Sequence, residues 1–346
     1  MSTNTEYPGQ LDSINGRRRF VTGVSALGGA QLLGMPLLAA AEPPPETTRI
    51  SLFEGPPTCL APQYVAQDLL HAEGFSDVRY VKFERDTKQW PPDVVISGEA
   101  DLCFSFPPQD IAHIDAGAPV VVLAGIHSGC VEVVGGAGVR STLELKGKKV
   151  SVSELGSDEH IFISMFAAYV GLDPRKDINW VVNPHIECVK LLMEGKIDAF
   201  FCGPPQSLEM RQKKIGHVLV STTVDKPWSH HTCCLVASNK DFVRKHPVAT
   251  KRALRALLKA TDICAAQPAR AAQIVTERGW APYNNNLQML RELPYGKWRE
   301  FDPEDALRFY ALRMRELGMV KAAPNKIIAE GTDWRFLNEL KKELKA

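Results

Sequence analysis

The sequence has almost no excess charge of either sign, because its 346 residues include 41 Lys and Arg against 40 Asp and Glu. This balance excludes a nucleic-acid binder that relies on bulk positive charge. The sequence also lacks internal repeats of solenoid length, and its only biased segment is a run of three prolines at 43–45. With 45% hydrophobic residues, the chain is neither disordered nor collagen-like, and its length suits roughly two domains.

Motifs for catalysis and for metal binding are also missing. The chain contains no Gly-x-Ser-x-Gly, no His-Glu-x-x-His and no phosphate-binding P-loop. Its eight cysteines form no Cys-x-x-Cys pair, and several lie in apolar runs, as Cys103 and Cys202 do. We therefore expect no enzyme, no cofactor and no metal. Most of the cysteines are predicted to be small buried hydrophobes, although one or two disulfides of undefined pairing stay open.

Long apolar runs are absent except near the N-terminus. Three arginines at 17–19 precede an uncharged apolar run over 21–41, which ends in three alanines. A basic segment, a short apolar segment and an Ala-x-Ala exit predict a signal peptide over residues 1–41. The arginines together with Phe20 are similar to a twin-arginine export motif, so we expect a periplasmic protein. The alternative is a membrane anchor.

Short apolar runs alternate with helical patterns along the rest of the chain. Such alternation is typical of βαβ units with mostly parallel sheets, and a glycine just past a helix is typical of a left-handed cap. Strands are predicted at 50–53, 78–83, 94–96, 102–104, 120–123, 149–152, 178–182, 198–202, 217–221 and 232–237. Helices are predicted at 62–72, 108–116, 158–170, 186–194 and 205–213, with further helices beyond 240.

These elements fall into two α/β blocks, near 46–125 and 130–222, which predict two lobes. The strand over 232–237 is expected to return to the first block. Lobe 1 then comprises 46–125 and 232–346, whereas lobe 2 comprises 126–231.

A set of short motifs appears in a characteristic order along the chain: 54–58, 61–66, 98–101, 105–108, 145–150, 156–160, 195–199, 203–205 and 242–247. In this order the chain resembles the solute-binding proteins of ABC importers for nitrate, taurine, alkanesulfonates and thiamine-precursor pyrimidines. The resemblance implies an α/β, type II periplasmic-binding-protein fold with two mostly parallel sheets. It also implies a monomer that closes on a small molecule and docks on a membrane permease, with no nucleic-acid partner.

Ligands of open α/β sheets bind beyond the carboxyl ends of the strands, where helix N-termini present free N–H groups. Three loops of the sequence fit this position, and they carry the candidates Glu54, Thr58, Ser105, Pro107, Gly156, Ser157 and Asp158. The Ser and Thr hydroxyls would donate to a sulfonate or carboxylate. The acidic side chains would instead suit an amine or amidine, so the charge of the ligand stays open. Helix capping is the alternative role of these residues.

Further candidates lie where the chain is expected to cross between the lobes: His127, Ser128, Gly203, Pro204, Trp228 and His230. Trp228 could stack on a flat ring or pack in a core. The run from His230 to Cys234 is rich in metal-ligating residues, but a strand would place only two of them on each face.

The same run is loosely similar to a His- and Cys-rich stretch of the eukaryotic thiamine-pyrimidine synthases. Leu235 and Val236 stand where that stretch continues with cysteine and an aromatic residue. The sequence therefore predicts an exported receptor for a small organic ligand. A pyrimidine synthase that uses pyridoxal phosphate, and a metal carrier that uses His230, His231, Cys233 and Cys234, are the alternatives.

Overall fold

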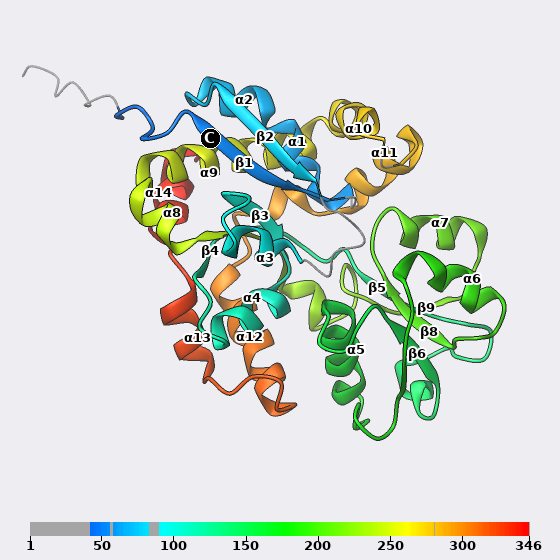
Figure 1. The fold of residues 1–346 in the computed structure, drawn as a ribbon. Helices are drawn as coiled ribbons and strands as arrows, with labels where there is room; N and C mark the ends of the chain where they lie inside the picture. The colour runs from blue at the N-terminus through cyan, green and yellow to red at the C-terminus, as the bar shows by residue number, and fades with distance from the viewer. Residues whose placement is uncertain (1–41, 56–57, 83–89, 280, 346) are drawn as a thin grey trace, which may run out of the picture. The chain divides into compact units, whose positions relative to one another are not determined.

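The computed structural model describes residues 42–55, 58–82, 90–279 and 281–345. The predicted signal peptide at 1–41 lies outside these residues. None of the described helices is both long and apolar enough to span a bilayer. The structure is drawn as a ribbon in Figure 1.

The first of two five-stranded sheets has the order β2-β1-β3-β10-β4. It contains β1 (Arg49–Glu54), β2 (Asp77–Lys82), β3 (Leu102–Ser105), β4 (Val120–Ser128) and β10 (Thr232–Asn239). The strand β10 runs antiparallel to both of its neighbours, and the other pairs are parallel. The prediction that a strand beginning at residue 232 returns to the first block is thereby confirmed.

The second sheet repeats this plan with the order β7-β6-β8-β5-β9. It contains β5 (Glu132–Gly135), β6 (Lys149–Val152), β7 (Asn179–Val182), β8 (Ala199–Cys202) and β9 (His217–Ser221). Here β5 is the antiparallel strand, between β8 and β9. In each sheet four of the five strands therefore point the same way, as predicted, although the single antiparallel strand gives each sheet two parallel and two antiparallel pairs. The sequence did not predict β5, whose four residues end at a pair of glycines.

Helices follow most strands and cover the sheets. Those up to residue 213 are α1 (Ala61–Val65), α2 (Gln67–Ala72), α3 (Pro91–Ile96), α4 (Pro107–Asp115), α5 (Asp158–Tyr169), α6 (Cys188–Met193) and α7 (Gln206–Lys213). The C-terminal helices are α8 (Lys240–Lys245), α9 (Pro247–Ala266), α10 (Pro268–Glu277), α11 (Tyr283–Glu292), α12 (Pro303–Glu316), α13 (Pro324–Gly331) and α14 (Arg335–Glu343). The helix α9 packs on α1, α2 and α14, and α12 packs on α4 and α13, so the C-terminal helices brace the first sheet.

The predicted strand over 94–96 is wrong, because these residues belong to α3. Two prolines open this helix, and its Asp93 carboxylate accepts a hydrogen bond from the backbone N–H of Trp90 at 2.7 Å. Three consecutive apolar residues fit a strand and a helix equally well. The capping signal at the start of the segment is what identifies it as a helix.

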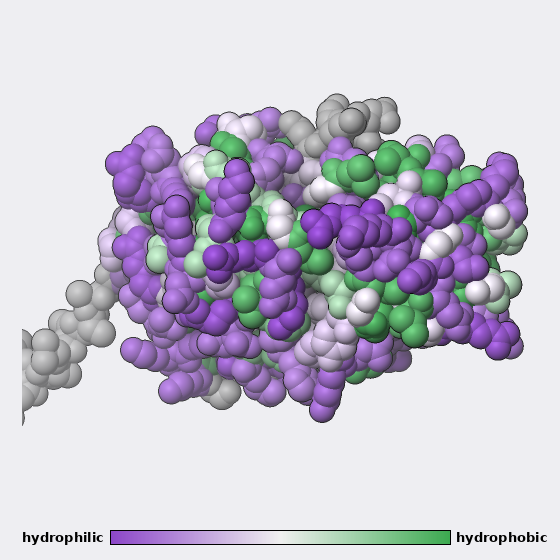
Figure 2. Space-filling view, turned by 90° about the horizontal axis from the view of Figure 1, so that it is seen from below, coloured by the Kyte–Doolittle hydropathy of each residue, from purple (hydrophilic) through white to green (hydrophobic). Residues whose placement is uncertain are grey.

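Apolar packing holds the described residues together. One large cluster of buried side chains includes residues of both sheets, and a smaller one lies beside β8 around Phe200 and Leu192. The face in Figure 2 is largely hydrophilic, with separate apolar patches. The exposed large apolar side chains of the described residues are concentrated between Leu143 and Val224.

The chain passes between the sheets twice, from β4 to β5 and from β9 to β10, and the two crossings touch. Gly129 has φ +53°, and a Cβ atom there would overlap the backbone of Thr222 and Thr223. The Thr222 hydroxyl also accepts hydrogen bonds from the backbone N–H groups of Cys130 and Val131, and it donates one to the carbonyl oxygen of Val131. Glycine is therefore required at position 129 by both conformation and space.

Replacing Gly129 with alanine should lower the free energy of unfolding by about 2–4 kcal/mol, because the new methyl group forces the two crossings apart. Urea unfolding measures this change. Gly138→Ala is the matched control, since a Cβ there meets nothing within 4 Å and φ is not positive. Equal stability of the two variants would show that the crossings do not pack as described.

Candidate functional site

Four helices each begin shortly after the carboxyl end of a strand. They are α1 after β1, α4 after β3, α5 after β6 and α7 after β8. Each has a polar side chain with buried atoms in its first turn, namely Gln63, Asp110, Asp158 and Gln206. We call the first turns of these four helices, with these four residues, the acceptor turns. In Figure 1, α4 and α5 lie next to each other, and contacts between them bring the first and second sheets together here.

Two contacts link the helices α3 and α4 of the first sheet to the region around β6 and α5 of the second sheet. The Trp90 indole N–H, at the start of α3, donates to the Glu154 carboxylate after β6 at 3.0 Å. Phe106, just before α4, meets Phe162 of α5 edge to face, with ring centroids 6.3 Å apart. The start of α4 and the start of α5 are therefore held close to one another.

Two acids of the acceptor turns are buried almost completely. Asp110 and Asp158 are 0% and 4% exposed. Burial raises the pKa of Asp110 to about 7, although a hydrogen bond from the Ser105 hydroxyl at 2.6 Å opposes the rise. Burial also raises the pKa of Asp158 well above its usual range, and the charges of Asp110 and Glu159 add to this rise. The site thus concentrates acidic groups that need a partner.

Several hydrogen-bonding atoms of the acceptor turns and of Ser153, the residue after β6, have no partner among the described residues. They are one carboxylate oxygen each of Asp110 and Asp158, both amide atoms of Gln63, the amide oxygen of Gln206 and the hydroxyl of Ser153. Buried polar groups are normally paired, and an orphan costs about 1–3 kcal/mol. Most of these orphans accept hydrogen bonds. A molecule that offers N–H donors would satisfy them.

The hydroxyls that the sequence predicted as donors to an anion have partners in the protein. Thr58 donates to the Asn286 side chain at 3.0 Å, and Ser105 donates to Asp110. The Ser157 oxygen caps α5 by accepting from the backbone N–H of His160. Two of the three donors are thus used within the protein, which disfavours an anionic ligand, and the capping alternative holds for Ser157, whose cap uses the oxygen rather than the O–H.

The remaining predicted residues are divided between this site and other places. Glu54 ends β1 and is buried, Pro107 opens α4, and Gly156 precedes the cap of α5. Gly203 and Pro204 lie between β8 and α7, next to Gln206. All of them thus lie at strand ends or helix starts, as predicted.

Trp228 and His230 lie apart from the acceptor turns. The Trp228 ring is 3% exposed and packs against Phe166, Tyr169 and Phe309, whereas His230 is exposed. Trp228 therefore has the alternative role of a core side chain.

Sequence reasoning missed Gln63, Asp110 and Gln206. Each of them stands within the first turn of a helix. The sequence candidates came from loops. The first turn of a helix also borders the region beyond a strand end, so these three residues can face a ligand as well.

His127 and Ser128, at the end of β4, are buried beside a group of cysteines. A ring nitrogen of His127 and the sulfurs of Cys59 and Cys130 all lie within 4.8 Å of one another. A thiol interaction with Cys130, together with His127, lowers the pKa of Cys59 to about 6 despite its burial. The predicted metal-carrier residues do not converge in this way, because His231 stacks on Phe309, with ring centroids 4.0 Å apart.

Replacing Asp110 with asparagine should change how stability depends on pH. Its pKa of about 7 in the folded protein exceeds the ordinary value of 3.8, so the folded state binds the proton more tightly. This contribution is complete below pH 4 and is lost as the pH rises through 7. Between pH 5 and pH 8 the Asp110→Asn variant should gain roughly 3 kcal/mol of unfolding free energy relative to the natural chain. Urea unfolding at both pH values measures this difference, and a constant difference would contradict the raised pKa.

The comparisons with known proteins agree with this fold. A family model described as NMT1/THI5 like matches residues 61–271. The bicarbonate-binding protein CmpA of Synechococcus elongatus is 28% identical over 151 residues, which are 43% of this chain and 33% of CmpA. A putative thiamine biosynthesis protein of Haemophilus influenzae is 26% identical over 238 residues, which are 66% of this chain and 68% of that protein. The match to CmpA thus spans about a third of its length.

Among solved structures, the periplasmic nitrate-binding protein NrtA from Synechocystis superposes with a TM-score of 0.74 at 19% sequence identity. The superposition covers 87% of this chain and 90% of NrtA. This similarity shows the two-sheet periplasmic-binding-protein fold that the sequence motifs implied. Because the family model matches more than half of the residues, the chain belongs to the NMT1/THI5-like family.

Proposed function

We propose that this chain is the periplasmic solute-binding receptor of an ABC importer. Its ligand is a small organic molecule that donates hydrogen bonds from nitrogen, such as an aminopyrimidine or an amidine. The observation that carries this proposal is the set of orphan acceptors in the acceptor turns, above all those of Asp110 and Asp158.

The chemistry of a carboxylate explains the choice of ligand. An amidinium offers two parallel N–H donors, and so does an aminopyrimidine protonated at the ring nitrogen next to its amino group; a carboxylate accepts two parallel hydrogen bonds. A ligand held in this way would stabilise the ionised acids and so lower their raised pKa values. An anion at the same place would lie beside two acids and would favour their protonated forms.

The names of the relatives support a small-molecule receptor but differ in their cargo. CmpA is named for bicarbonate and NrtA for nitrate, whereas the Haemophilus protein is named for thiamine biosynthesis. A bound pyrimidine would agree with the last of these names. The orphan acceptors favour it over the two anions.

The two sheets and their helices form the two lobes in this proposal. Lobe 1 comprises 46–125 and 232–346, lobe 2 comprises 126–231, and a monomer closes when ligand joins the acceptor turns. The closed form would then dock on a membrane permease, because ligand binding shifts the equilibrium between open and closed forms. Export would use a twin-arginine signal within residues 1–41.

Thermal unfolding of the chain from Glu42 onward tests this function. Aminopyrimidines, amidines, alkylamines, nitrate, bicarbonate and alkanesulfonates are each added in large excess. A ligand at about a hundred times its dissociation constant adds about 3 kcal/mol, which raises the unfolding midpoint by several degrees. We expect this rise from the nitrogen donors alone. A rise from oxyanions alone would contradict the ligand class, and no rise from any compound would contradict the receptor.

The purified chain also distinguishes a receptor from a synthase. A synthase that uses pyridoxal phosphate would bind that compound and show its absorption band. After incubation with pyridoxal phosphate and removal of the unbound compound, we expect no such band on the protein, and its appearance would favour the enzyme.

A further inference from the structure

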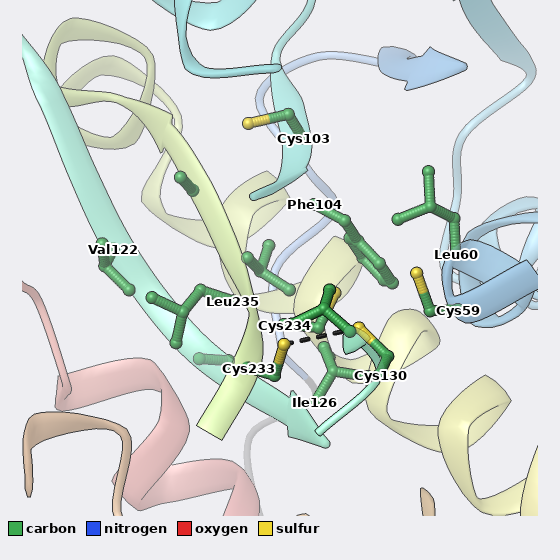
Figure 3. Packing of buried hydrophobic residues seen from close by; sticks show 14 of the residues in the cluster. Cys59, Leu60, Cys103, Phe104, Val122, Ile126, Cys130, Cys233, Cys234 and Leu235 are labelled. Atoms are coloured by element: carbon green, nitrogen blue, oxygen red, sulfur yellow. Dashed lines mark hydrogen bonds between the residues drawn. The ribbon is translucent and has the colours of Figure 1, made fainter. Parts of the chain in front are cut away.

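Four buried side chains from three separate segments meet where the chain leaves the first sheet. Cys59 lies in a short 3-10 helix after β1, His127 and Cys130 lie at and beyond the end of β4, and Cys233 lies in β10. The sulfurs of Cys130 and Cys233 are 3.3 Å apart. Figure 3 shows Cys59, Cys130 and Cys233 gathered here, with the contact between the last two dashed. We call these four residues the Cys3His cluster.

The hydrogen bonding of His127 leaves one nitrogen free for a ligand. Its Nδ1 lies 3.2 Å from the carbonyl oxygen of Ser128. A carbonyl oxygen only accepts, so Nδ1 carries the proton and Nε2 keeps its lone pair. The side chain is 0% exposed, and Nε2 has no hydrogen-bond partner among the described residues. Histidines that bind metals typically donate their other ring N–H to such a carbonyl group.

We propose that the Cys3His cluster binds a zinc ion in tetrahedral coordination. Three cysteines and one histidine are a typical ligand set of a closed zinc site. Zinc–ligand bonds of about 2.0–2.3 Å place the ligand atoms roughly 3.3–3.8 Å apart in a tetrahedron. The Cys130–Cys233 separation already lies in this range. The ligand atoms of Cys59, His127 and Cys130, which all lie within 4.8 Å of one another, would approach by up to about 1 Å, and the Cys233 sulfur, which lies beside Cys130 but outside this group, would move further.

The surroundings of the cluster suit an ion. The Tyr295 hydroxyl donates to the backbone carbonyl of Cys59 at 3.0 Å, and its ring packs edge to face on His127. Cys130 also lines a cavity of about 420 Å³ that Glu132 and Ser207 border. Binding would release the thiol protons to solvent as the thiolates coordinate the metal.

A disulfide between Cys130 and Cys233 is the competing use of the same sulfurs. It would account for their short separation. A disulfide would not involve the free lone pair of His127 or the Cys59 sulfur that lies close to it, whereas a zinc ion would bind all four side chains.

The ion would tie the loop after β1 and the strand β10 to the first crossing between the sheets. Of the four residues in the predicted metal carrier, this site uses only Cys233. The inference does not depend on the ligand in the acceptor turns, so each proposal can fail without the other.

Cobalt substitution tests the site. The chain from Glu42 onward is reduced, freed of metal with a chelator and titrated with Co²⁺ without oxygen. We expect one ion per chain, with the ligand-field bands of tetrahedral cobalt and a sulfur-to-cobalt charge-transfer band that Zn²⁺ abolishes. His127→Gln and Cys130→Ser should lose these bands. Cys188→Ser is the matched control, because Cys188 is also buried but lies on α6, beside the second sheet.

Protection from alkylation gives a second measurement on the natural chain, should the cluster variants fail to fold. In moderate urea, Zn²⁺ should slow the alkylation of Cys59, Cys130 and Cys233 at least tenfold and leave that of Cys188 and Cys202 unchanged. The proposal is overturned if the natural chain gives no thiolate–cobalt band or if Zn²⁺ protects none of the three. A Cys130–Cys233 disulfide that persists while the chain binds no metal would also overturn it.

Discussion

Replacing Asp158 with asparagine should weaken the binding of an aminopyrimidine or amidine by about thirtyfold to a thousandfold. Asparagine has the same shape but offers one acceptor and one donor where the carboxylate offers two acceptors. Losing one partner of a buried, charge-assisted contact typically costs about 2–4 kcal/mol, which corresponds to this change in the dissociation constant. Isothermal titration with the compound that raises the unfolding midpoint most is the measurement.

The Asp158→Asn variant should still fold, because it removes a buried acid rather than an apolar contact. Asp241→Asn, an exposed change on α8, is the matched control and should leave the affinity unchanged. If Asp158→Asn binds as tightly as the natural chain, the ligand does not reach the start of α5.

Replacing Trp228 with alanine should lower the free energy of unfolding by about 3–5 kcal/mol, as truncation of a buried aromatic residue does. The ring packs edge to face on Phe166 and Phe309, with centroids 4.6 and 5.4 Å away, and near-parallel to Tyr310 at 6.5 Å. It thus joins α5, α12 and the second crossing between the sheets. Guanidinium unfolding measures the loss.

Trp228→Phe keeps most of the buried area and should cost much less than the alanine change. Its affinity for ligand should equal that of the natural chain, since the ring lies in an aromatic core. A variant that keeps its stability but loses ligand binding would instead make Trp228 a stacking platform, as one interpretation of the sequence allowed.

Most of the fold could be predicted from the sequence because strand and helix periodicities are regular here. Gly117, Gly171 and Gly195 follow predicted helices, and all three have positive φ as a left-handed cap requires. The ordered motifs then identified the fold. The errors lie in short segments, such as β5 and the second half of α3, where two or three consecutive apolar residues fit either structure.

The candidate site was predicted less well, for a physical reason. The sequence places Ser105, Ser157 and Thr58 at helix starts, but it does not show which hydroxyls the protein itself uses. Asp110, five residues after Ser105, accepts a hydrogen bond from the Ser105 hydroxyl, so this donor is used within the protein. The Cys3His cluster was also hidden, because its three cysteines are far apart in the chain.

Calorimetric titration with two matched compounds tests the central claim most directly. One is a 4-aminopyrimidine, and the other is the same ring with a methyl group in place of the amino group. A site of buried acceptors should reject the methyl compound by about a hundredfold or more, because its acceptors would stay unpaired. We predict micromolar or tighter binding of the amino compound and at least this difference. Equal affinities for the two compounds, or tight binding of nitrate or bicarbonate alone, would contradict an acceptor-rich site that selects nitrogen donors.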